Sequence, residues 1–269
     1  MKIAKLLLIN LLLVFSSLSI AQGGISVTST IIEHEISPGE HISDETIISI
    51  DSADNPENFS AEVMGMSMSL YGSKNVVPVD EDKYAFSAQP FLKITPEFFH
   101  LEPGESQNLL IEGDVPDDVT SGTWYALAEV MTNITEDEAT KIGTISAIEI
   151  PILLTVSGSD LIRTGEIFDL QLDKPVSAQQ QNLSLTFKNT GNTHFKVLAK
   201  ADLLNENGDV LTSASAPLSS NSIIPEASYL FKLNIKTEEE LMPGDYLINA
   251  TVALEDESVL ASKEVKFRI

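Results

Sequence analysis

The sequence predicts an all-β protein made of two tandem β-sandwich domains, and three observations lead to this prediction. Helical periodicity is nearly absent, and short runs rich in Ile, Val, Leu, Thr and Phe lie between clusters of Pro, Gly, Asn and Asp. Seven such runs fall in each half of the chain. A block of about thirty residues also recurs at a constant offset of 122 positions, which indicates that one sandwich unit is used twice.

The repeat needs no gap. Its matching pairs are Leu101/Ile223, Pro103/Pro225, Leu109/Phe231, Ile111/Leu233, Gly122/Gly244, Trp124/Tyr246, Ala126/Ile248, Ala128/Ala250 and Val130/Val252. Each block has a Pro-containing turn, an alternating strand, a Gly turn and a second strand whose inner face begins with an aromatic residue. We therefore expect Trp124 and Tyr246 at equivalent positions, with Trp124 as a core anchor rather than a ligand platform.

Seven strands in each half suit an immunoglobulin-like sandwich. In the first half we expect strands at Ile25–Ile36, Glu45–Asp51, Phe59–Met68, Phe91–Ile94, Gln107–Ile111, Thr123–Met131 and Thr144–Val156. In the second half we expect them at Glu166–Leu172, Leu183–Lys188, Lys196–Leu204, Val210–Ser213, Tyr229–Ile235, Tyr246–Leu254 and Lys263–Ile269. The polar joint Ser157-Gly158-Ser159-Asp160 separates the two, so the predicted domains are 22–158 and 159–269.

Residues 1–21 have the pattern of a secretory signal peptide. Lys2 and Lys5 precede the apolar run 6–15, and Ser19-Ile20-Ala21 forms a small-residue cleavage site. We expect cleavage before Gln22, and an uncleaved anchor is the alternative. No later segment approaches the roughly 20 apolar residues of a membrane span. The mature chain is therefore expected in the periplasm, outside the cell or at the cell surface.

Composition excludes several functions. The chain has no Cys, which rules out disulfides, Cys-based metal sites and thiol catalysis. It has 40 acidic and 16 basic residues, and such a negative field disfavours nucleic acid as a partner. The charge is uneven, because residues 22–158 hold 24 acidic and 4 basic residues whereas residues 159–269 hold 16 and 10. This pattern fits either simple solvation or an acidic face for a cation or a basic partner.

The first half contains the stretches 90–96 and 101–111 and the alternating strand Ile145–Val156. Through these segments it resembles the amino-terminal domain of periplasmic pilus chaperones and related cell-wall-binding surface domains. The resemblance implies that this last strand pairs with an extended segment of a partner by strand addition. It also implies a basic pair for the partner's terminal carboxylate, but neither Ile25–Ile36 nor Thr144–Val156 contains Lys or Arg. The second half resembles repeat modules of surface adhesion proteins, through the stretches 187–192 and 241–246.

No catalytic motif is apparent, so we expect a non-enzymatic protein without a cofactor or a defined metal site. Met64, Met66 and Met68 alternate on one strand face, where gap-filling is favoured over binding of a soft metal ion. A plain hairpin turn is favoured over a Ca²⁺ loop at 205–209. Carboxylates also cluster at Asp80-Glu81-Asp82, Asp114/Asp117/Asp118 and Glu136-Asp137-Glu138, where Ca²⁺ is the alternative to solvation. The candidate glycosylation sites are Asn58, Asn133, Asn182 and Asn249.

The main functional hypothesis is a secreted or surface module that binds a protein or a cell-surface polymer through sandwich edges and loops. The alternatives are an assembly chaperone that donates a strand, and an enzyme without a local signature. The predicted binding edge is the strand Ile145–Val156, with Ile148, Ile150, Ile152 and Leu154 on one face. Pro151 favours an edge location because it lacks an N–H. We expect Ile150→Lys or Ile152→Lys to abolish binding while the fold survives.

Overall fold

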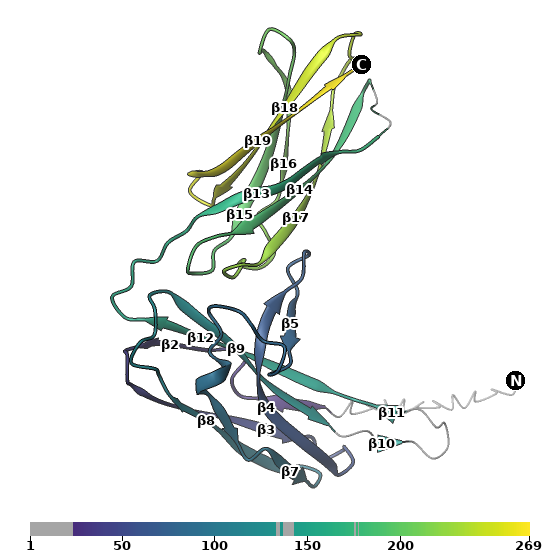
Figure 1. Cartoon of the computed structure of the whole chain (residues 1–269). Coiled ribbons are helices and arrows are strands. Elements are labelled where there is room, and N and C mark those ends of the chain that lie inside the picture. The colour runs from purple at the N-terminus through teal and green to yellow at the C-terminus, as the bar shows by residue number, and fades with distance from the viewer. Residues whose placement is uncertain (1–23, 133–134, 137–142, 175, 177) are drawn as a thin grey trace, which may run out of the picture.

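The computed structural model describes residues 24–132, 135–136, 143–174, 176 and 178–269. The described chain is almost entirely β-structure and contains one short 3₁₀ helix, η1 (Gln89–Phe91). Figure 1 shows two sandwiches that follow one another along the chain. The all-β, two-sandwich, immunoglobulin-like prediction is confirmed.

The first sandwich consists of two packed sheets. One sheet has the order β1-β3-β8-β6, from β1 (Ile25–Val27), β3 (His41–Ile50), β8 (Ser106–Asp114) and β6 (Lys93–Thr95). The other has the order β2-β12-β9-β4-β5, from β2 (Ile32–Ile36), β12 (Ala147–Val156), β9 (Thr123–Thr132), β4 (Glu57–Met68) and β5 (Lys74–Val77). In this second sheet, β7 (Phe98–Leu101) also pairs with β4. A small separate hairpin is formed by β10 (Thr135–Glu136) and β11 (Gly143–Thr144).

The first predicted strand, Ile25–Ile36, proves to be two strands in different sheets. β1 pairs antiparallel with β3, whereas β2 crosses to the opposite sheet and pairs parallel with β12. Sequence pattern did not reveal the crossing because β1 is only three residues long and the link 28–31 contains no Pro or Gly to mark a break. The structure also adds β5 and β7, which lie in stretches where the sequence predicts no strand.

The second sandwich has all seven predicted strands. Three form the sheet β13-β14-β17, from β13 (Gly165–Leu172), β14 (Gln180–Asn189) and β17 (Ser228–Lys236). Four form the sheet β16-β15-β18-β19, from β16 (Val210–Ala216), β15 (Val197–Leu204), β18 (Asp245–Leu254) and β19 (Val259–Arg268). The division at 158/159 stays a prediction, and it lies between the end of β12 and the start of β13.

The repeat appears in the structure with its exact offset. The bounds of β8 and β17 differ by 122 residues at both ends, and so do those of β9 and β18. Both aromatic residues lie on central strands, and each donates a hydrogen bond to the carbonyl four residues earlier. The Nε1 of Trp124 is 3.1 Å from the oxygen of Thr120, and the hydroxyl of Tyr246 is 2.8 Å from the oxygen of Met242. This bond is characteristic of the corner before a central strand in immunoglobulin-like sandwiches.

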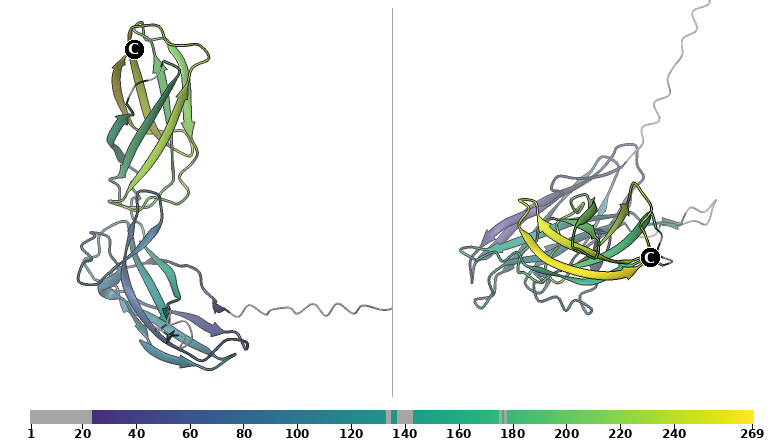
Figure 2. Two further views of the ribbon diagram at one scale, coloured as in Figure 1. Left: turned by 90° about the vertical axis from the view of Figure 1, so that its right-hand side faces the viewer. Right: turned by 90° about the horizontal axis from the view of Figure 1, so that it is seen from above.

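The two sandwiches share an apolar contact. The core of the second sandwich extends onto the outer face of the first, where it includes Met66, Tyr125 and Leu127. Backbone bonds join the two units as well. The N–H of Thr123 donates to the carbonyl of Asn192 at 2.9 Å, and the N–H of Leu230 donates to the carbonyl of Leu70 at 2.8 Å. Both views in Figure 2 are consistent with this stacked arrangement. A buried apolar junction with backbone bonds limits relative motion of the two sandwiches.

A search for membrane-crossing helices in the described residues finds none of sufficient length and apolarity.

Candidate functional site

Strand β12 is covered on one side along its whole length and on the other side along only part of it. β9 pairs with β12 from Ala147 to Thr155, whereas the parallel strand β2 pairs only with Ile152–Val156. No described strand pairs with the remaining side of Ala147–Pro151, which we call the open edge. The expectation that the whole strand is an edge is therefore corrected. Ile152 and Leu154 lie where the strand is paired on both sides, because the crossing of β2 into this sheet covers them.

The backbone groups at the open edge can be assigned from the hydrogen bonds at the two ends of the strand. The N–H of Thr132 donates to the carbonyl of Ser146, and the N–H of Val156 donates to the carbonyl of Gly122. Even-numbered residues therefore bond to β9. Because the bonding direction alternates along an antiparallel strand, the N–H and C=O groups of Ala147 and Glu149 point to the open edge.

Pro151 belongs to the same alternation. Its nitrogen faces away from β9, so the missing N–H removes no bond from the β9–β12 ladder. The predicted link between this proline and an unpaired edge is thus correct for the amino-terminal half of the strand. Directly after Pro151, β12 also pairs with β2 on the side opposite β9.

The predicted site residues lie on the inner face of β12 rather than on an accessible face. Ile150, Ile152 and Leu154 are fully buried in the core of the first sandwich, and Ile148 packs against it. A lysine at Ile150 or Ile152 would place an unpaired charge in this core, which costs several kcal/mol. From this burial we expect Ile150→Lys and Ile152→Lys to destabilise the first sandwich, which replaces the expectation from the sequence that its fold survives.

Sequence reasoning missed an apolar residue that does reach the surface here. Ile145 precedes β12 and is 54% exposed. Together with the half-buried Ile148 it gives the open edge an apolar rim. The sequence contains a signal for this residue, because Ile145 is the first residue of the predicted strand Ile145–Val156.

A cavity of about 350 Å³ lies at the junction of the sandwiches, where the resemblance to pilus chaperones implies a basic pair. Its lining residues are Glu33, His34, Glu35, Leu153, Thr155, Leu161 and His194. His194 is a hydrogen-bond partner of the Tyr125 hydroxyl at 3.0 Å, and burial lowers the pKa of its imidazole. The ring is therefore neutral at neutral pH. With two carboxylates and a neutral imidazole, this cavity disfavours a carboxylate ligand.

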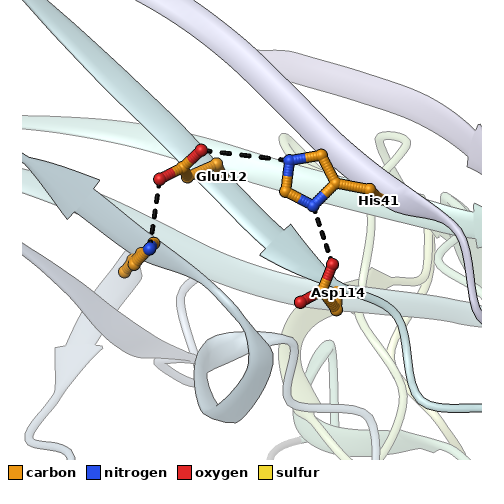
Figure 3. Close-up of polar contacts among 4 residues, drawn as sticks. His41, Glu112 and Asp114 are labelled. Atoms are coloured by element: carbon orange, nitrogen blue, oxygen red, sulfur yellow. Dashed lines mark hydrogen bonds and ion pairs between the residues drawn. The ribbon is translucent and has the colours of Figure 1, made fainter.

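The remaining histidines lie in surface polar contacts. Figure 3 shows His41 between Asp114, at 2.7 Å from Nδ1, and Glu112, at 3.9 Å from Nε2. His34 pairs with Asp44, and His100 bonds to Asn58 at 3.0 Å. The His41 and His100 contacts join paired strands, whereas the His34–Asp44 contact joins β2 to β3 of the other sheet. Such surface contacts contribute at most about 1 kcal/mol each. Burial raises the pKa of Tyr125, the phenol beside His194, which makes it a poor nucleophile.

The other candidate sites have structural explanations. Met66 is buried, and Met68 packs against the same core. The turn at 205–209 joins β15 to β16, and the side-chain oxygen of Asn205 accepts the N–H groups of Asn207 and Asp209 at 2.9 Å. Within the described residues, no group of three or more His, Asp or Glu side chains is arranged to hold a metal ion. The segment 136–138 lies partly outside those residues.

The glycosylation candidates are spread over both sandwiches. Asn58 on β4 and Asn182 on β14 are exposed, and Asn249 on β18 is half-buried. Asn133 lies outside the described residues.

No family model and no curated protein matches this sequence. Similar solved structures include the periplasmic chaperone SfaE, at 12% identity over 90% of this chain and 98% of that chain, with a TM-score of 0.40. They include the class 5 fimbriae chaperone CfaA, at 8% identity over 91% and 98%, with a TM-score of 0.44. The Salmonella enterica SafA pilin–SafB chaperone complex is similar at 12% identity over 91% and 96%, with a TM-score of 0.41. These values are low, so the fold rests on the sheet pairings described above: the chain is a two-sandwich immunoglobulin-like protein.

Proposed function

We propose that this protein is a non-catalytic binding protein of the periplasm or cell surface that takes up an extended segment of a protein partner as an added strand. The open edge of Ala147–Pro151 is the observation that carries this proposal. Its unpaired N–H and C=O groups are the groups that strand addition uses.

The composition of the open edge supports the same function. An apolar strand with an uncovered edge promotes aggregation unless something covers it. The second sandwich does not serve as the cover, because it packs on the outer face of the sheet at Met66, Tyr125 and Leu127. The remaining covers are a partner's strand and a second copy of this chain. Ile145 and Ile148 provide apolar contacts for either one.

Assembly chaperone is the form of this function that the sequence resemblance favours. The resemblance includes the strand that carries the open edge, and SafB, one of the similar structures, is in complex with a pilin. The acidic cavity at the junction limits the analogy, because Glu33 and Glu35 disfavour a terminal carboxylate there. We therefore place the partner's contact at the open edge alone.

The test uses a short peptide in which valine alternates with threonine around a central glutamine. We expect titration of the peptide into the mature protein to slow hydrogen exchange at the amides of Ala147 and Glu149. The same peptide with N-methyl groups on alternate residues is the control, because it keeps the side chains and loses the backbone donors. It should give no protection.

A proline variant tests whether the backbone of the open edge binds the peptide. Ala147→Pro removes an N–H that points to the open edge and keeps every bond to β9, as Pro151 already does. We expect this variant to bind the peptide more weakly, whereas Ala147→Ser should bind it as the parent does. Equal binding by the parent and Ala147→Pro, or equal protection by both peptides, would overturn the proposal.

A further inference from the structure

Three glutamates form a continuous row across the sheet that ends at the open edge. Glu62 on β4 is directly opposite Glu129 on β9, and Glu129 is directly opposite Glu149 on β12. The inner faces of these strands carry Val63, Val130 and Ile150, so the glutamates lie on the outer face. Directly opposite side chains have Cβ atoms about 5 Å apart, and like charges in this arrangement are destabilising.

The fold does not neutralise this row. Within the described residues, no ion pair joins any of the three carboxylates to a basic side chain. Lys93 lines the same cavity of about 400 Å³ as Glu62 and Glu129, but its Nζ is 3.1 Å from Oε1 of Glu112. The unpaired carboxylates therefore continue up to Glu149, the residue next to the unpaired side of the sheet.

A strand added beside β12 would extend the row by one position. We propose that the partner segment bound at the open edge carries a lysine or arginine opposite Glu149. This inference rests on the proposed strand addition and specifies its chemistry. A cation at this position would give the row its first opposite charge and would convert an unfavourable cross-strand contact into a favourable one.

The pleat of the sheet determines the rest of the partner's pattern. The neighbours of the basic residue would lie on the inner face, beside Ile148 and Ile150. The next residues along would return to the outer face, beside Ala147 and Pro151. The expected partner segment is therefore a basic residue between two apolar ones, in an extended stretch.

The test compares three alternating valine–threonine peptides that differ only in the central residue, which is lysine, glutamine or glutamate. We expect the full mature protein to bind the lysine peptide about fivefold more tightly than the glutamine peptide, and the glutamate peptide more weakly than either. Glu149→Gln should reduce the preference for lysine. Glu264→Gln, which removes an exposed carboxylate from β19 of the second sandwich, should leave it unchanged. Added NaCl should also reduce the preference.

The outcomes distinguish the two proposals. Equal affinities for the three peptides, with Ala147 and Glu149 protected by each, would overturn the charge preference and leave strand addition standing. Binding of no peptide would overturn strand addition and the preference with it. A preference for lysine that persists in Glu149→Gln would also overturn this inference.

Discussion

Trp124 and Tyr246 occupy equivalent positions in the two sandwiches and make the same hydrogen bond. Each begins the inner face of a central strand, and each bonds to the carbonyl four residues earlier. Their ring neighbours differ. Trp124 meets Phe86 and Phe91 at centroid distances of 5.9 and 5.8 Å, whereas Tyr246 stacks on Phe267 at 5.6 Å. The corner bond is therefore the shared feature of the repeat, and the packing around it is specific to each unit.

We expect Tyr246→Phe to lower the free energy of unfolding by about 1 kcal/mol, because the carbonyl of Met242 loses its donor while the ring remains. Urea unfolding followed by circular dichroism measures the change. Tyr71→Phe is the control, since Tyr71 is 67% exposed. An equal effect of the two substitutions would show that the corner bond contributes nothing.

Glu129 gives a pH-dependent prediction. Burial raises the pKa of its carboxyl group, and Glu149 and Glu62 raise it further. A raised folded-state pKa means that this group favours folding below its unfolded pKa and loses that contribution as the pH rises through the folded value. Glu129→Gln should therefore stabilise the protein at neutral pH by about 0.5 kcal/mol, and the gain should vanish in acid. Unfolding curves measured from acid to neutral pH test this prediction, and Glu264→Gln, which removes an exposed carboxylate from β19 of the second sandwich, should show no gain.

At the scale of elements, the crossing of the first strand decides where the open edge lies. β1 pairs in one sheet and β2 in the other, so the cover over β12 begins only at Ile152. If β2 continued over the amino-terminal half of β12, no backbone groups would be free there. The segment 28–31, which connects β1 to β2, therefore determines where the proposed site lies.

The turn between β14 and β15 contacts the first sandwich through Asn192, whose carbonyl accepts the N–H of Thr123. Gly122 has a φ of 131°, and a Cβ there would lie 2.4 Å from the carbonyl oxygen of Asn192. Gly122→Ala should therefore cost more than about 1 kcal/mol and loosen the contact between the sandwiches. We expect faster hydrogen exchange at Thr123 and Leu230, whose amides bond across the junction. Gly24→Ala, where a Cβ would meet nothing within 4 Å, should change neither rate.

For the whole molecule, the uneven charge makes the two sandwiches respond differently to salt. Residues 22–158 carry 24 acidic and 4 basic side chains, against 16 and 10 in residues 159–269. Screening relieves more self-repulsion in the more charged unit. NaCl or Ca²⁺ should therefore slow hydrogen exchange more at Leu109, in the core of the first sandwich, than at Leu233 in the second. Equal slowing at the two amides would contradict the prediction.

The sequence by itself determined the β-class, the two-unit organisation and the seven strands of the second sandwich. Alternation and turn residues are local signals, and the offset of 122 residues makes the repeat visible without any structure. It also indicated, through Pro151, that β12 has an unpaired part. Only the tertiary structure decided which part, because pairing depends on where β2 crosses between sheets. The glutamate row was equally hidden, since Glu62, Glu129 and Glu149 are far apart in the chain and the register of three strands brings them together.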